Sequence, residues 1–376
     1  MSQIKKVSNW TDYNKSLVKR GEIIFNISEE FSQKLYYEGA QKRGGFRKYS
    51  REMFEFILYI KVLLRFPIRA AIGFATGILS KIFGNKEFKM PNYAHASREI
   101  NKLDLKIQNH VKPGESIALC FDSTGIKIYS SSDWHQRKYS KSEASSCEKW
   151  IKVHIAQDLD SGQILSYEVT SSTTNDCEVI EKLIDKLELD NEIKVESIRG
   201  DGAYDTYKMY EIGHQLGAKV LIPPSATSKA QDELSAQTKI NNIRRKGKKL
   251  DYLKQRDETI KYIRQYETFE EGLKKWKESS KYHERSRVEA TMHRIKRTFG
   301  FCTQFKLEKS RCNEITIKMN VLNRMLLLGK AEYHEGVFQK GDKLPKKTSE
   351  TSKKLDQNAL NSVISVIGCE KFECVM

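Results

Sequence analysis

The sequence predicts an α/β protein in which helices flank a mixed β-sheet, with a helical N-terminal domain and a charged insertion before the last core helices. One observation is that apolar runs typical of strands begin only near Val111 and continue to Pro223. The other is that the later runs alternate with helical segments, while the early ones follow one another directly. Strands in succession, followed by alternating helices and strands, indicate a mixed sheet covered by helices.

The first predicted domain, residues 1–110, is helical and basic. Ser50 can cap a helix, and its apolar residues recur at helical spacing at Phe54, Ile57, Leu58 and Val62. Pro67 ends this pattern and can open a second helix, and the turn at Pro91 leads into another helix that contains Arg98. Short helices with tight turns and basic ends are typical of a helix-turn-helix DNA reader. A helical scaffold or dimerisation domain would show the same pattern.

The predicted sheet domain consists of residues 111–224 together with residues 272–329. Its first four strands are expected at residues 116–122, 125–129, 150–155 and 163–169. A helix with one apolar face follows at about 179–187, and a second is expected at 206–217. Two later strands are expected at 194–201 and 218–222.

The predicted insertion, residues 225–271, is charged and poor in large apolar residues, and we expect it to lie on the sheet or on DNA. It includes the basic cluster Arg244, Arg245 and Lys246. A helix is then expected from a cap at Ser279 or Ser280 to Gly300, followed by another at about 314–328. Residues 330–376 are mostly polar, and we expect them to form a mobile tail.

Composition narrows the class of protein. A formal net charge of +17 favours a polyanionic partner such as nucleic acid. The seven cysteines include no C-x-x-C pair, which argues against a zinc ribbon or a disulfide framework and favours a reducing compartment. The most apolar stretch, residues 53–82, is interrupted by charged residues and Pro67, so no membrane span is expected. Residues 1–10 show no apolar signal-peptide core. We therefore expect a cytoplasmic protein.

Three acidic residues occupy informative positions. Asp122 and Asp201 each end a predicted strand, and Glu289 lies in the predicted helix before Gly300. Carboxylates at adjacent strand ends converge on one sheet edge, and they repel each other unless a positive charge lies between them. Hard divalent cations prefer such oxygen ligands, so the three acids form a candidate metal site. Any one of them alone could instead be a strand-end cap or a surface charge.

One face of the helix that carries Glu289 is polar. At about 100° per residue, Tyr282, Arg285, Glu289 and Lys296 lie within a stripe of about 60°. The stripe could be an exposed ion-pair ladder, because Arg285 and Glu289 are four residues apart. Alternatively, two cations that flank a metal-binding acid would suit the phosphates of a substrate. His154, in a predicted strand, is expected to be a satisfied sheet histidine.

The sequences around the three acids resemble those of the DDE transposases of bacterial insertion sequences. Asp122 lies in Phe121-Asp-Ser-Thr-Gly-Ile-Lys127, and Asp201 lies in Asp201-Gly-Ala-Tyr-Asp205. Glu289 lies in a segment with the family spacing Y, two residues, R, three residues, E, six residues, K, from Tyr282 to Lys296. Two other segments also resemble sequences of this family: Trp150–His154 and Thr174–Asp176. The resemblance covers residues 40 to 330.

The resemblance implies a ribonuclease-H-like fold for the sheet domain. It also implies that Asp122, Asp201 and Glu289 are the catalytic residues and bind two Mg²⁺ or Mn²⁺ ions. The reaction would be cut-and-paste transposition, in which DNA is cut at the end of the element and joined to target DNA. Two alternatives remain: a metal-dependent nuclease on the same core, and a transposase-derived DNA-binding protein without activity.

The implied partner is double-stranded DNA, both the terminal inverted repeats of the element and the target. The chain is expected to act as a homodimer or a larger assembly, associated with the nucleoid and with no membrane. The predicted DNA-contacting residues are Tyr282, Arg285, Lys296, Arg98, Arg244, Arg245 and Lys246.

Overall fold

The computed structural model describes residues 7–22, 29–40, 43–44, 46–84, 87–108, 111, 114–128, 150–187, 193–234 and 251–333. The predicted basic cluster at residues 244–246 and the predicted tail after residue 333 lie outside these ranges. The chain divides into two compact units, of which one contains Met1–Ser97 and Arg324–Met376 and the other contains Arg98–Asn323.

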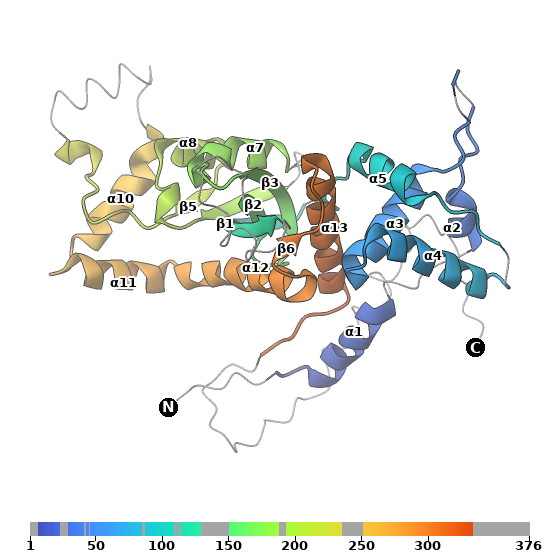
Figure 1. Cartoon of the computed structure of the whole chain (residues 1–376). Coiled ribbons are helices and arrows are strands. Elements are labelled where there is room, and N and C mark those ends of the chain that lie inside the picture. The colour runs from blue at the N-terminus through green and yellow to red at the C-terminus, as the bar shows by residue number, and fades with distance from the viewer. Residues whose placement is uncertain are drawn as a thin grey trace, which may run out of the picture. The chain divides into compact units, whose positions relative to one another are not determined.

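The first unit is helical. Its helices are α1 (Trp10–Glu22), α2 (Glu29–Lys34), α3 (Arg51–Leu64) and α4 (Ile68–Ile82), and α5 (Tyr93–Lys102) crosses into the second unit (Figure 1). The Ser50 side chain accepts a hydrogen bond from the backbone N–H of Met53, which confirms the predicted cap of α3. Arg65 ends α3 in a left-handed conformation, and α4 begins directly after Pro67. The apolar face of α3 then packs against α4.

Among the residues that the structure describes, no single helix is long and apolar enough to cross a membrane. The helices α3 and α4 reach that apolar content only as a pair, and they are bent by 108° at the break between them.

The second unit contains a mixed sheet of six strands within the described ranges (Figure 1). They are β1 (Ser116–Ile128), β2 (Trp150–Asp158), β3 (Ile164–Ser171), β4 (Lys194–Arg199), β5 (Lys219–Leu221) and β6 (Cys302–Thr303). The order is β3-β2-β1-β4-β5, with β6 paired to β1. The pairs β1–β2 and β2–β3 are antiparallel, whereas β4, β5 and β6 pair in parallel. The predicted mixed sheet flanked by helices is confirmed.

One strand differs from the sequence prediction. Residues 116–122 and 125–129 were expected to form separate strands, but β1 runs without a break from Ser116 to Ile128. The reason is its partner, because β2 pairs with β1 from Leu119 through Asp122 to Lys127. Asp122 therefore lies within a strand instead of ending one.

The apolar core of the sheet lies between its strands and two helices. The side of β1 that carries Ile117, Leu119 and Phe121 packs with α7 (Ile180–Asp185) and α8 (Tyr207–Gln215). Because side chains alternate along a strand, Asp122 faces the other side of the sheet. In Figure 1, α12 (Ser286–Phe299) covers that side, and it contacts β1.

The predicted insertion contains two helices in its described part, α10 (Lys254–Ile263) and the start of α11 (Phe269–Ser279). It also contains the short 3-10 turns η3 (Gln231–Glu233) and η4 (Asp251–Leu253), and a further one, η5 (Tyr282–Arg285), follows α11 outside the insertion. The predicted helix start at Ser279 or Ser280 is wrong. Both hydroxyls donate to the Trp276 carbonyl and so end α11, and Lys281, in a left-handed conformation, separates α11 from η5.

The last helix, α13 (Glu308–Leu327), supports an irregular segment of the second unit through buried asparagines. Asn313, Asn320 and Asn323 bind backbone groups between residues 100 and 108. Asn323 alone accepts from the N–H of Ile164 at 2.9 Å and donates to the carbonyls of Ile164 at 2.8 Å and Gln108 at 3.0 Å. The side-chain amides of these asparagines thus give this irregular backbone segment the hydrogen bonds that a neighbouring strand would otherwise supply.

Replacement of Asn323 by leucine should therefore destabilise the protein strongly. The leucine would fill a similar volume but leave buried backbone groups unpaired, and we expect the free energy of unfolding to fall by about 2 kcal/mol or more. Urea denaturation measures this change, with Lys309→Ala at an exposed position of α13 as the control. Equal stability of Asn323→Leu and the control would contradict the role assigned to Asn323.

Candidate active site

Asp122 and Asp201 lie beside each other because of the parallel pairing of β1 and β4. Cys120 is paired with Arg199, and the two acids each lie two residues further along their chains. Asp201 follows the end of β4 and caps η2 (Gly202–Tyr204), with its carboxylate accepting from the N–H of Ala203 at 2.9 Å. Sheet register thus brings the first two predicted acids together.

The half-buried carboxyl group of Asp122 is held in an electrostatically crowded place. Burial raises its pKa above the ordinary value, and the charges of Asp201 and Glu289 raise it further. The N–H of Ser123, which donates to Oδ1 at 2.8 Å, and the guanidinium of Arg285 lower the pKa. Glu289 lies in the same neighbourhood, because Arg285 contacts both Glu289 and Asp122.

Arg285 occupies the space between two of the acids. Its Nη1 lies 3.5 Å from Oδ2 of Asp122, and its Nη2 pairs with the carboxylate of Glu289 one helical turn later. The side chain of Glu289 is 55% exposed, whereas those of Asp122 and Arg285 are largely covered. A positive charge therefore already compensates part of the negative charge at this edge of the sheet.

The start of α12 is fastened to the end of β4 by the residues of η5. The hydroxyl of Tyr282 donates to the carbonyl of Gly200 at 2.9 Å, and Glu284 pairs with Arg199 at 3.2 Å. Gly200 itself allows the loop to close, because a Cβ atom there would lie 2.9 Å from the ring of Tyr204. These contacts set the position from which α12 presents Glu289.

Tyr282 was predicted to contact DNA, but the structure gives its hydroxyl a different partner. The residue is 8% exposed, and its ring packs against Trp276 at a centroid distance of 5.6 Å. Burial raises the pKa of Tyr282 to about 12. A hydroxyl that is already bound to Gly200 does not face a DNA backbone, so in this structure Tyr282 positions α12.

The donor chemistry at this edge suits a hard divalent cation, since three carboxylates supply only oxygen ligands. Within the described ranges, however, no three acidic, histidine or cysteine side chains are close enough to form a ready metal site. The guanidinium of Arg285 lies where such a cation would neutralise the negative charges of Asp122 and Glu289. Metal binding here therefore requires Arg285 to turn away from at least one of the two acids.

On the other face of the sheet, the two further segments singled out in the sequence meet. His154 is fully buried, with Nε2 2.8 Å from the Thr170 hydroxyl and Nδ1 3.0 Å from Oδ1 of Asp176. It lies buried in the sheet as predicted, but of its two ring nitrogens Nε2 has a hydrogen-bond partner, whereas Nδ1 lies near Asp176 without a hydrogen bond. Nζ of Lys152 lies 3.0 Å from the same Asp176 oxygen. The turn η1 (Asp176–Val179), which begins at Asp176, contacts η2 and so lies behind the loop of Asp201.

The remaining predicted DNA contacts are dispersed. Lys296 is half-buried on α12, two turns after Glu289, and Arg98 is exposed on α5. Sequence reasoning did not identify Arg199 or Glu284, and it did not pair Asp205 with Arg256. Their local sequence gives no sign of these pairings, although Asp205 ends the family-like segment Asp201-Gly-Ala-Tyr-Asp205.

The second unit is thus a domain with a mixed sheet, helices on both of its faces, and an acidic edge near Asp122 and Asp201. Two family models, both described as a transposase DDE domain, match this chain, one over residues 113–326 and the other over residues 18–131. The first covers more than half of the chain, and the protein belongs to this family of DDE transposases. Membership implies the use of a divalent metal ion.

A solved structure, described as the Drosophila P element transposase strand transfer complex, is also similar to this chain. The similarity covers 81% of this chain and 71% of that chain, at 13% sequence identity and a TM-score of 0.28.

The environment of His154 predicts a loss of stability in acid. Burial lowers its pKa below the ordinary value, with Lys152 acting in the same direction, while Asp176 and Glu168 oppose the shift. The unfolded chain therefore binds the proton more readily, so this contribution to stability is complete above about pH 6.5 and is lost as the pH falls below it. Urea denaturation between about pH 8 and pH 5 should show a shallower loss for His154→Gln than for the parent. Parallel curves would refute this assignment.

Proposed function

We propose that this DDE transposase binds the terminal inverted repeats of a mobile element, cuts the DNA there and joins the freed ends to target DNA. The observation that carries the proposal is the side-by-side placement of Asp122 and Asp201 by sheet register, with Glu289 presented from α12. All three lie in sequence segments that resemble the catalytic motifs of insertion-sequence transposases. The reaction is a cut-and-paste transfer of phosphodiester bonds.

In this proposal, Asp122, Asp201 and Glu289 together hold two divalent ions, Mg²⁺ or Mn²⁺. When bound, such ions stabilise charge on the attacking and leaving oxygens of a phosphodiester. The protein supplies the frame: β1 and the loop after β4 fix two carboxylates, and α12 carries the third. The exposure of Glu289 leaves this acid accessible to an incoming DNA backbone.

Arg285 and Lys296 have a separate role in the proposal. Arg285 compensates Asp122 and Glu289 in the structure. Once a metal ion neutralises these two carboxylates instead, the planar guanidinium of Arg285 is free to hold a phosphate next to the scissile bond. Lys296 lies seven residues after Glu289, close to two full turns, and is directed to the same side of α12.

Recognition of the element is assigned to the helical first unit and to the exposed Arg98. The charge of +17 favours double-stranded DNA as the partner, both transposon ends and target. The transposase would act at the nucleoid as a homodimer or a larger assembly, since two ends must be brought together. The basic cluster at residues 244–246 would add phosphate contacts.

A single assay separates this function from the two alternatives. Purified protein is incubated with labelled element-end DNA and a target plasmid in the presence of Mg²⁺ or Mn²⁺. Products joined to the target support the transposase, whereas cut but unjoined DNA indicates a nuclease. Retarded DNA without any cutting, in both metals, indicates a DNA-binding protein that has lost the reaction.

Asp201→Asn should abolish cleavage while leaving the affinity for element-end DNA unchanged or slightly higher. The substitution keeps the shape of the side chain but removes a charge that attracts metal and repels phosphate. Cleavage and gel-retardation assays measure the two effects. Asp232→Asn is the matched control, because Asp232 is an exposed acid that pairs with Lys261 in the insertion. Normal cleavage by Asp201→Asn would remove Asp201 from the proposed metal ligands.

Lys296→Ala should fold normally but lose strand transfer by about tenfold or more, which corresponds to about 1.4 kcal/mol of transition-state stabilisation. Binding to long DNA should weaken much less, because many other basic residues contact phosphates. The neighbouring exposed Arg297 supplies the control variant Arg297→Ala. If joining rates of Lys296→Ala and Arg285→Ala both equal that of the parent, this face of α12 is only an ion-pair ladder.

A further inference from the structure

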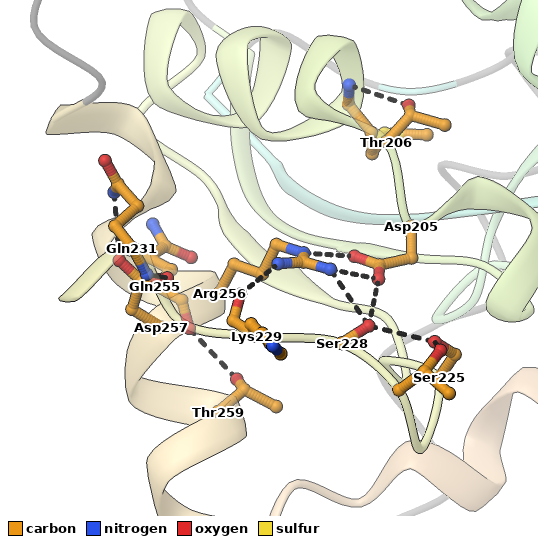
Figure 2. A network of polar contacts seen from close by, with 12 residues as sticks. Asp205, Thr206, Ser225, Ser228, Lys229, Gln231, Gln255, Arg256, Asp257 and Thr259 are labelled. Carbon is orange, nitrogen blue, oxygen red and sulfur yellow. Dashed lines mark hydrogen bonds and ion pairs between the residues drawn. The ribbon is translucent and has the colours of Figure 1, made fainter. Parts of the chain in front are cut away.

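A buried ion pair joins the insertion to the loop that carries Asp201. Asp205 lies four residues after Asp201, between η2 and α8, and Arg256 lies on α10. Nε and Nη2 of Arg256 donate to the two carboxylate oxygens of Asp205, both at 2.8 Å (Figure 2). The side chains of Arg256 and Asp205 are only 13% and 9% exposed. A two-pronged contact of this kind fixes orientation as well as distance.

The pair is enclosed by further polar contacts, which Figure 2 shows. The hydroxyl of Ser228 accepts from Nη2 of Arg256 at 3.0 Å, and the carbonyl of Lys229 accepts from Nη1 at 3.3 Å. The same Ser228 hydroxyl lies 3.5 Å from Oδ2 of Asp205, to which it donates. Both members of the pair therefore have their polar atoms largely satisfied inside the protein.

Three consecutive residues of α10 each hold a different segment. Gln255 accepts from the N–H of Val220 at 2.8 Å and donates to the carbonyl of Ala218 at 3.2 Å, so it binds β5. Arg256 binds Asp205, and Asp257 accepts from the backbone N–H of Gln231 at 3.1 Å and from its side-chain amide at 2.9 Å. The first turns of α10 thus connect the sheet edge, the Asp201 loop and η3.

A displacement of Asp205 would move Asp201. The intervening residues form one 3-10 turn, with Tyr204 N–H donating to the Asp201 carbonyl and Asp205 N–H donating to the Gly202 carbonyl. If Arg256 were lost, the Asp205 carboxylate would remain buried without its partner, a state that strongly disfavours the native loop. The loop would then open toward solvent, and the carboxylate of Asp201 would no longer lie beside that of Asp122.

We propose that Arg256 is a positioning residue of the transposase: through Asp205 it holds Asp201 in the place where it acts. The inference rests on the proposed function only in assigning Asp201 a role in metal binding. The insertion then has a role besides contact with DNA, because its helix α10 holds the loop of Asp201 in position at the acidic edge.

The test compares Arg256→Met, which removes the charge, with Arg256→Lys, which keeps the charge but loses the two-pronged contact. Lys261→Met is the matched control, because Lys261 lies on the same helix and pairs with Asp232 on the exposed surface. The first readout is hydrogen exchange of residues 200–206 in the full chain, without metal or DNA. The second is the Mn²⁺ concentration that gives half-maximal cleavage, measured beside thermal stability.

We expect exchange at residues 200–206 to rise by about tenfold in Arg256→Met, through local opening of the loop. The Mn²⁺ requirement should rise several-fold, with Arg256→Lys between Arg256→Met and the parent, whereas Lys261→Met should match the parent. A fall in thermal stability with parental exchange and a parental Mn²⁺ requirement would overturn the proposal and leave a purely structural ion pair. If Arg256→Met does not fold, parental values in Arg256→Lys overturn the proposal equally. The exchange readout stands even if the chain proves inactive, so failure of the positioning role and failure of the proposed function are distinguishable.

Discussion

The arrangement of this site depends on the parallel pairing of β4 with β1. That register places Asp122 and Asp201 side by side, and half-buried like charges at such short range are costly without compensation. Arg285 provides the compensation in this structure, and it does so from the end of η5, directly before α12, where it also reaches Glu289. The electrostatic requirement of the acids therefore couples the sheet to a helix that lies more than 80 residues further along the chain.

The loop after β4 is where distant parts of the second unit converge. Tyr282 and Glu284 bind it from the side of α12, and Arg256 binds it from α10. The turn that begins at Asp176 contacts it from the opposite face of the sheet. An acid at the tip of such a loop is held by contacts made late in the sequence, so its geometry is complete only when the insertion and α12 have both docked on the sheet.

Much of this organisation could be predicted from the sequence, because buried elements produce a local pattern of apolar residues. Apolar runs located the strands, and the spacing of acids and cations located the candidate site. Contacts between residues that are distant in the sequence produce no such local pattern. The first strand was expected to end at Asp122, yet β2 pairs with β1 beyond this residue and keeps the following residues in the same strand. Ser279 or Ser280 was expected to begin a helix, yet both end α11, and Lys281 follows in a left-handed conformation. Arg256 stands in a charged stretch, and only the fold reveals that it is buried against Asp205.

The contact of Gln255 with β5 has a consequence for behaviour in solution. In the strand order β3-β2-β1-β4-β5, β5 lies at one end, and an end strand offers free backbone groups to any other extended chain. The amide of Gln255 occupies an N–H and a carbonyl there, much as a neighbouring strand would. This contact thereby keeps the sheet from growing by edge-to-edge addition at β5, so any self-association of the chain is left to other surfaces.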